Sequence, residues 1–206
     1  MNTLPLCCIS RHRINSDGNG ISSLVAVKGC PLNCRWCINR EPLKTYKVTD
    51  VTPQELYERV KIDNLYFLST DGGVTFGGEE PLLYAGFISD FTDLPDVVWN
   101  VNIETSLNVP LDNLKKVIGK INEYFVDIKD MNTDIYKSYC GTDNSQVIEN
   151  LKYLISHEDS ERIKIRIPLI PDFNTESDRE KSAEKLKKMG FDRFDFFQYI
   201  IPGKKP

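Results

Sequence analysis

The 206-residue sequence contains no run of about 18 consecutive apolar residues, the length that a membrane-spanning helix needs. Its N-terminal segment also lacks the apolar core of a secretory signal peptide. Basic residues are not in excess, because 26 Lys and Arg stand against 30 Asp and Glu, and the net charge of −4 provides no general attraction to nucleic acid or anionic membranes. We therefore expect a cytoplasmic protein that binds neither nucleic acid nor membranes.

Repeats, low-complexity tracts and linkers are absent as well, and we expect residues 1–206 to form one domain. The pattern predicts strands at residues 24–28, 73–76, 97–103, 124–128, 163–167 and 194–199, and helices at 53–61, 111–120, 145–157 and 176–189. Residues 84–90 are ambiguous because Gly86 interrupts them. Strands that alternate with helices indicate an α/β fold with a parallel sheet and right-handed crossovers. This number of units favours a partial (β/α)6 barrel, with a doubly wound open sheet as the alternative.

Half of the six cysteines lie within eight residues of one another, at Cys30, Cys34 and Cys37. Cytoplasmic thiols stay reduced, so this clustering indicates metal binding rather than disulfides. A tetrahedral zinc ion needs a fourth ligand, and His12 and Cys140 are remote in sequence. An iron–sulfur cubane can take three thiolates and leave one iron open for a ligand. Zinc completed by a distant residue remains the alternative.

The other cysteines are not part of this motif. Cys140 is interpreted as a packing residue, and Cys7 and Cys8 have no assignable role.

The Cys-x3-Cys-x2-Cys spacing, with Trp36 before the last cysteine, resembles the signature of the radical S-adenosylmethionine (radical SAM) superfamily. The segments 17–21 and 27–37 resemble those of the activating enzymes of glycyl radical enzymes, such as the pyruvate formate-lyase activases. The resemblance implies a partial barrel of the radical SAM type. It also implies one [4Fe–4S] cluster on Cys30, Cys34 and Cys37, with S-adenosylmethionine as its cofactor. Trp36, which stands between two of these cysteines, is expected to cover the cluster or the cofactor, with ordinary core packing as the alternative.

Residues 74–83 resemble the glycine-rich motif with which this family meets the amino group of the cofactor. The resemblance implicates Gly77, Gly78, Glu79 and Glu80 in cofactor binding. Glycines allow a close backbone approach, and a carboxylate suits an ammonium group. Aligned on the proline that follows, Glu80 is the motif glutamate, and Glu79 stands where the family usually has glycine.

Charged and hydroxyl side chains follow the next strands. The resemblance implies that Glu104, Thr105, Asp127 and Lys129 contribute to a cation site and to cofactor contacts, although residues of this kind are equally typical of solvated loops. Arg166 interrupts an apolar strand pattern, so it needs an anionic partner. That partner is either the cofactor carboxylate, as the resemblance implies, or an internal salt bridge.

Residues 197–204 resemble the closing motif of the activases, which implicates Tyr199 in cofactor binding. Ile200 stands where those enzymes have a histidine.

These motifs share one position in the predicted fold. Each lies at or near the carboxyl end of a predicted strand, and that face carries the active site in barrels and open sheets alike. The resemblance implies reductive cleavage of S-adenosylmethionine to a 5′-deoxyadenosyl radical, which takes a hydrogen atom from a glycine of a partner glycyl radical enzyme. It also implies a low-potential electron donor such as flavodoxin or ferredoxin. The alternatives are a radical SAM enzyme that acts on a small molecule or peptide, and a non-catalytic metal-binding module.

Overall fold

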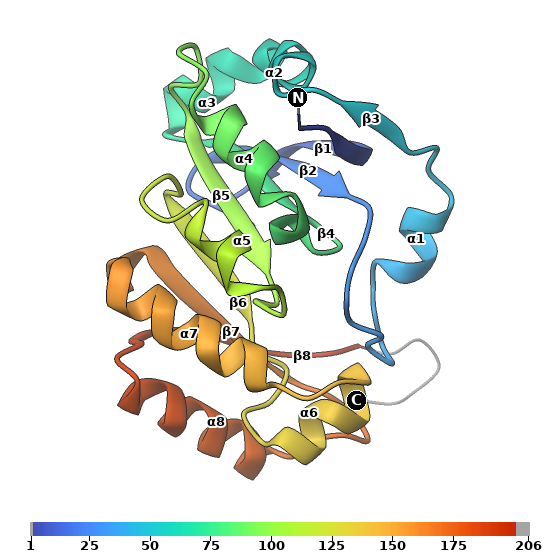
Figure 1. Cartoon of the computed structure of the whole chain (residues 1–206), viewed down its shortest axis with the longest axis vertical. Coiled ribbons are helices and arrows are strands. Elements are labelled where there is room, and N and C mark those ends of the chain that lie inside the picture. The colour runs from blue at the N-terminus through green and yellow to red at the C-terminus, as the bar shows by residue number, and fades with distance from the viewer. Residues whose placement is uncertain (1, 201–206) are drawn as a thin grey trace.

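The computed structural model describes residues 2–200. Within them, eight strands form one sheet in the order β3-β1-β2-β4-β5-β6-β7-β8 (Figure 1). The strands are β1 (Leu4–Ile14), β2 (Ile21–Val27), β3 (Thr49–Val51), β4 (Gly73–Gly78), β5 (Asn100–Thr105), β6 (Glu123–Asp127), β7 (Ile163–Leu169) and β8 (Arg193–Gln198). The strands from β2 through β4 to β8 pair in parallel, whereas β1 pairs antiparallel with β2 and β3.

Helices connect the parallel strands. They are α1 (Arg40–Lys44), α2 (Pro53–Val60), α3 (Asn64–Thr70), α4 (Ala85–Thr92), α5 (Leu111–Lys115), α6 (Thr133–Cys140), α7 (Ser145–His157) and α8 (Glu176–Lys188). Short 3-10 turns lie at Lys61–Asp63, Pro81–Tyr84 and Ser160–Arg162. Each described helix is too short or too polar to cross a membrane.

The predicted α/β fold, a partial (β/α)6 barrel, is confirmed. The six predicted strands are β2 and β4 to β8, and the sheet does not close within residues 2–200, because β3 and β8 form its edges. The ambiguous stretch 84–90 lies mostly in α4. The prediction missed β1, β3, α1, α3 and α6. The second half of β1 carries Arg11, His12 and Arg13 and is partly exposed, so it lacks the apolar alternation that identifies a strand.

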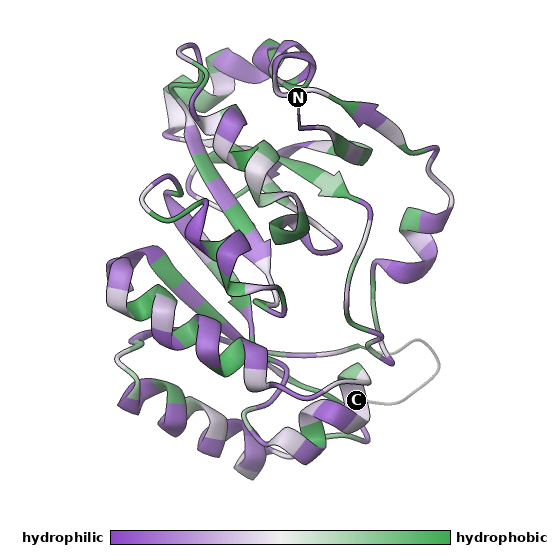
Figure 2. Cartoon of the chain, in the orientation of Figure 1, coloured by the Kyte–Doolittle hydropathy of each residue, from purple (hydrophilic) through white to green (hydrophobic). Residues whose placement is uncertain are grey.

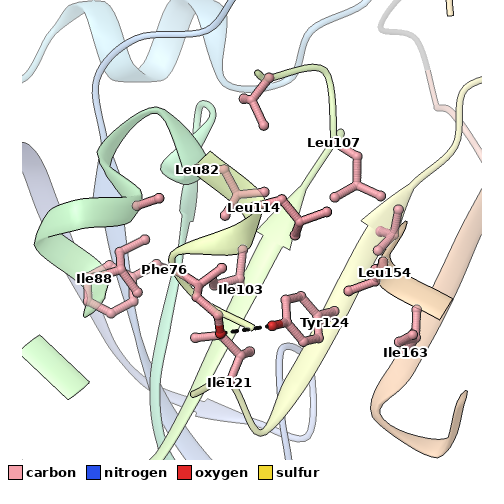
Figure 3. Close-up of a cluster of buried hydrophobic side chains, with 14 of the residues drawn as sticks. Phe76, Leu82, Ile88, Ile103, Leu107, Leu114, Ile121, Tyr124, Leu154 and Ile163 are labelled. Atoms are coloured by element: carbon pink, nitrogen blue, oxygen red, sulfur yellow. Dashed lines mark hydrogen bonds between the residues drawn. The ribbon is translucent and has the colours of Figure 1, made fainter. Parts of the chain in front are cut away.

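The hydrophobic core lies between one face of the sheet and the helices that cover it (Figure 3). Phe76, Ile103 and Tyr124 point from successive strands toward Ile88 on α4 and Leu154 on α7. Figure 2 shows hydrophilic and hydrophobic bands alternating along α7, as is typical of a helix that covers a sheet. Burial of these apolar side chains is the main stabilising contribution to the layer.

Polar side chains alternate with these core residues along the same strands, because successive residues of a strand point to opposite faces. Glu104 alternates with Ile103 on β5, and Asp127 follows Val126 on β6. Asp127 is paired in register with Arg166 of β7, and Arg166 in turn with Asp195 of β8. The concave face of the sheet is therefore charged near the carboxyl ends of its strands.

Candidate active site

A cavity of about 420 Å³ lies at the carboxyl ends of the parallel strands. Twelve of the fourteen predicted site residues line it, namely Cys30, Cys34, Cys37, Gly78, Glu79, Glu80, Glu104, Thr105, Asp127, Lys129, Arg166 and Tyr199. The sheet thus brings together side chains that are up to 169 positions apart in the sequence (199 minus 30).

Two predicted residues do not line this cavity. Trp36 packs against the hydrophobic core, partly buried, instead of covering the cavity. Gly77 lies behind Glu104, where an added Cβ would come within 2.9 Å of the Glu104 Oε2 atom. A glycine at position 77 therefore makes room for the glutamate that does line the cavity.

The segment that carries the three cysteines has no regular secondary structure and is held against the end of α6. The backbone N–H of Asn33 donates to the carbonyl of Cys140 at 2.9 Å, and that of Arg35 donates to the carbonyl of Tyr139 at 3.1 Å. Carbonyls in the last turn of a helix lack partners within the helix, so they are free to accept these bonds. Figure 1 shows the connection after β2 passing beside α6.

The loop after β4 holds the same segment from the other side. Glu79 accepts hydrogen bonds from Lys28 Nζ at 2.9 Å and from the backbone N–H of Gly29. Beyond the last cysteine, the Asn39 side-chain amide donates to the carbonyl of Gly78. Gly78 has a φ of 90°, a backbone conformation that favours glycine. Through its hydrogen bonds with Lys28 and Gly29, Glu79 is thus a carboxylate latch at the entrance of the cysteine segment.

Glu80 joins the loops that follow β4 and β5. Its buried carboxylate accepts hydrogen bonds from Thr105 Oγ1 at 2.7 Å, Ser106 N–H at 2.9 Å, Ser106 Oγ at 2.6 Å and Leu82 N–H at 3.2 Å. Burial raises the pKa of Glu80, although these hydrogen bonds oppose the shift. A carboxylate has about four acceptor positions. Glu80 uses them within the protein and braces the cavity wall.

Four charged side chains form one network on the concave face. Arg166 donates to Asp127 at 2.7 Å and to Glu104 at 2.9 Å, so the internal salt bridge predicted as one alternative is present. Lys129 lies 3.3 Å from Asp127 and donates to the Tyr199 hydroxyl at 2.9 Å. Burial disfavours the charge of Asp127, but Lys129 and Arg166 outweigh it and lower the pKa. Burial raises the pKa of Glu104.

The expected cation site gains no support from this network. Its two carboxylates, Glu104 and Asp127, already share the guanidinium of Arg166. Among residues 2–200, no three His, Cys, Asp or Glu side chains are grouped closely enough to hold a metal ion.

That observation applies to the cysteines as well, since Cys30, Cys34 and Cys37 line one cavity without converging on one point. Their chemistry nevertheless fits an iron–sulfur cluster. All three are free thiols on one irregular segment, and thiolates are the usual ligands of such clusters. The contact between Cys34 and Cys140 lowers the pKa of Cys34 to about 7, which favours its thiolate form, whereas burial raises the pKa of Cys30 to about 12.

Several lining residues were not predicted, among them Arg40, Tyr139, Asp195 and Phe197. Arg40 donates to the carbonyl of Cys34 at 2.8 Å and steadies the cysteine segment. Asp195 and Phe197 alternate along β8, and the period of two in that strand could have identified them. Residues 201–204 of the predicted closing motif lie outside the described part of the chain, whereas Ile200 is 90% exposed.

The fold and the cavity define an α/β enzyme-like domain with a three-cysteine segment at the carboxyl ends of a partial barrel. Residues 24–186 match the family model of the radical SAM superfamily. The chain belongs to this superfamily.

Among curated proteins, the chain is 28% identical over 207 residues to the pyruvate formate-lyase 2-activating enzyme of Escherichia coli, covering 85% of this chain and 70% of that protein. It is 25% identical to the (2S)-3-sulfopropanediol dehydratase activating enzyme of Klebsiella oxytoca, covering 81% and 71%.

Among solved structures, Streptococcus suis SuiB bound to the precursor peptide SuiA has a TM-score of 0.65. The sequence identity is 14%, and the match covers 86% of this chain but only 38% of SuiB. This likeness supports the fold alone.

Proposed function

We propose that this chain holds a [4Fe–4S] cluster on Cys30, Cys34 and Cys37 and cleaves S-adenosylmethionine reductively. The observation that carries the proposal is the shared cavity, in which three free thiols meet the charged ends of the parallel strands. The family membership over residues 24–186 supports the same assignment. When bound, the cluster and S-adenosylmethionine would supply the one-electron chemistry, and the protein would supply binding and orientation.

The residues of the chain have separate tasks in this proposal. Glu79 and the carbonyls at the end of α6 hold the cysteine segment at both sides. Arg166, Lys129, Glu104 and Asp127 provide a cavity wall in which two positive charges balance two negative ones. A ligand that itself carries ammonium and carboxylate groups would bind such a wall by exchanging partners with these ion pairs.

We further propose that the substrate is a glycine in the backbone of a partner glycyl radical enzyme. The relatives named above are activating enzymes for pyruvate formate-lyase and for a dehydratase. A glycine suits a site of this kind, since it can enter as bare backbone. A low-potential flavodoxin or ferredoxin as donor, a cytoplasmic location and one radical SAM domain over residues 1–206 belong to the same proposal.

The second candidate is radical chemistry on a small molecule or a peptide. It is favoured by Ile200, which is 90% exposed and replaces the histidine of the activases, so this position offers no imidazole to a ligand.

The test is anaerobic reconstitution with iron and sulfide, followed by assay of 5′-deoxyadenosine formation. About four iron and four sulfide per chain are expected for one cubane. Product that forms only with a glycyl radical enzyme supports the activase, and turnover with a small molecule or peptide selects the second candidate. About one zinc per chain and no sulfide would exclude both.

A further inference from the structure

Cys140, which the cluster motif does not use, lies against one of the three motif cysteines. The Sγ atoms of Cys34 and Cys140 are 3.8 Å apart. The two backbone hydrogen bonds between residues 33–35 and 139–140 lie on either side of this contact. They hold the two main chains at hydrogen-bonding distance, so the sulfurs can reach the roughly 2.05 Å of a disulfide by side-chain rotation.

The two thiols differ in access. Cys34 lines the cavity and is half-buried, whereas Cys140 is 1% exposed and packs in the core behind it. Of these two thiols, a small oxidant that enters the cavity therefore reaches Cys34 before Cys140. Cys140 is then the neighbouring thiol that can react with the oxidised sulfur.

We propose that Cys34 is an oxidative modification site in the cluster-free protein, with Cys140 as its resolving cysteine and peroxide as the oxidant. Cys34 attacks one peroxide oxygen, the O–O bond breaks, and a sulfenic acid and one water form. Cys140 then attacks the sulfenic sulfur and displaces a second water, which leaves a disulfide. Two electrons pass from the thiol pair to peroxide, and a dithiol reductant returns both thiols.

The consequence for metal binding rests on the proposed function. The disulfide removes Cys34 from the ligand set, so the oxidised chain cannot assemble the cluster. It also prevents the further oxidation of Cys34 to a sulfinic acid, which dithiol reductants do not reverse. Oxidation at this position is therefore reversible because Cys140 is beside it.

The test uses the full-length, cluster-free protein treated with equimolar hydrogen peroxide, then alkylated and mapped by mass spectrometry. Free thiols are expected to fall from six to four, and a peptide pair joined through Cys34 and Cys140 is expected. Dithiothreitol should restore all six thiols and the subsequent uptake of iron and sulfide. A disulfide that joins Cys34 to Cys30 or Cys37 overturns the proposal.

The Cys140→Ser variant supplies the second arm. Treated with two equivalents of peroxide, one for the sulfenic and one for the sulfinic acid, its Cys34 peptide should gain about 32 Da, and dithiothreitol should not restore iron uptake. The Cys8→Ser variant, altered away from the cavity, should behave like the parent chain. Full recovery of oxidised Cys140→Ser overturns the proposal. The disulfide map of the parent chain tests the proposal even where a variant fails to fold. If the untreated protein binds no cluster, that result counts against the proposed function alone, and the disulfide map still tests the oxidation.

Discussion

Replacement of Lys129 by methionine tests whether the charge network of the cavity acts as a unit. The Lys129 side chain is 10% exposed, and its ammonium lies 3.3 Å from Asp127. Burial disfavours the ammonium, but Asp127 outweighs this effect and raises the pKa of Lys129. Methionine keeps most of the side-chain volume and removes the charge, so the variant leaves two carboxylates to share one guanidinium.

The expected loss of stability depends on Arg166, the partner that Asp127 keeps in the variant. Removal of one member of a buried ion pair costs about 3–5 kcal/mol. Asp127 keeps Arg166 at 2.7 Å, so we expect Lys129→Met to lose stability at the lower end of this range, about 3 kcal/mol. With a denaturant slope of about 2 kcal/mol per molar urea, the unfolding midpoint should fall by about 1.5 M.

The measurement is equilibrium urea unfolding at pH 7, followed by circular dichroism. Lys115→Met is the matched control, because Lys115 pairs with Asp112 at 3.0 Å while their side chains are 46% and 83% exposed. An exposed pair of this kind contributes at most about 1 kcal/mol. If both variants lose the same stability, Asp127 is satisfied by Arg166 alone and the idea of a coupled network is refuted.

Three further predictions concern the site. Cys34→Ala should bind no iron or sulfide on reconstitution, while its unfolding free energy stays within about 1 kcal/mol of that of the parent chain. Full iron and sulfide content in this variant would contradict the assignment of Cys34 as a ligand. Glu79→Gly should lose about 1–2 kcal/mol of unfolding free energy and show faster hydrogen exchange at the Gly29 amide, because the hydrogen bonds of Glu79 with Lys28 and Gly29 are removed. Unchanged exchange at Gly29 would count against this role of Glu79. Because the folded protein lowers the pKa of Asp127, the ionised carboxylate stabilises the fold at pH values above the unfolded pKa of about 3.9, and this contribution is lost as the pH falls through the folded pKa. The urea midpoint of Asp127→Asn should therefore drop less between pH 5 and pH 3 than that of the parent chain. Equal drops would refute the assignment.

Local sequence pattern was sufficient to predict the parallel strands and the face on which the site lies. Ile163, Ile165 and Ile167 mark β7 by their period of two, and Arg166 within that run identifies the opposite, charged face. The same alternation placed Glu104 and Asp127 at strand ends, where parallel neighbours bring them together. Residues predicted in this way line the cavity because strand geometry fixes their direction.

The partners of these side chains were not predictable, because they depend on contacts between distant segments. Arg166 pairs with Asp127, 39 positions away, and Cys34 contacts Cys140, 106 positions away. Nothing in the local pattern around Cys140 marks it as different from a packing cysteine. The direction of the Trp36 side chain was not predictable either. Trp36 stands between two motif cysteines, yet its side chain packs against the hydrophobic core.

The anchoring of the cysteine segment explains how a segment without regular structure can still present three thiols to one cavity. Its own backbone lacks a ladder of hydrogen bonds, so its N–H groups need partners elsewhere. The carbonyls at the end of α6 accept hydrogen bonds from the N–H groups of Asn33 and Arg35, and the Glu79 carboxylate accepts one from the N–H of Gly29. Cys30 and Cys37 lie exposed between or beyond these anchors, so their side chains can move toward a common centre while the ends of the segment stay fixed. Glu79 is in this arrangement the residue that fixes the entrance of the segment.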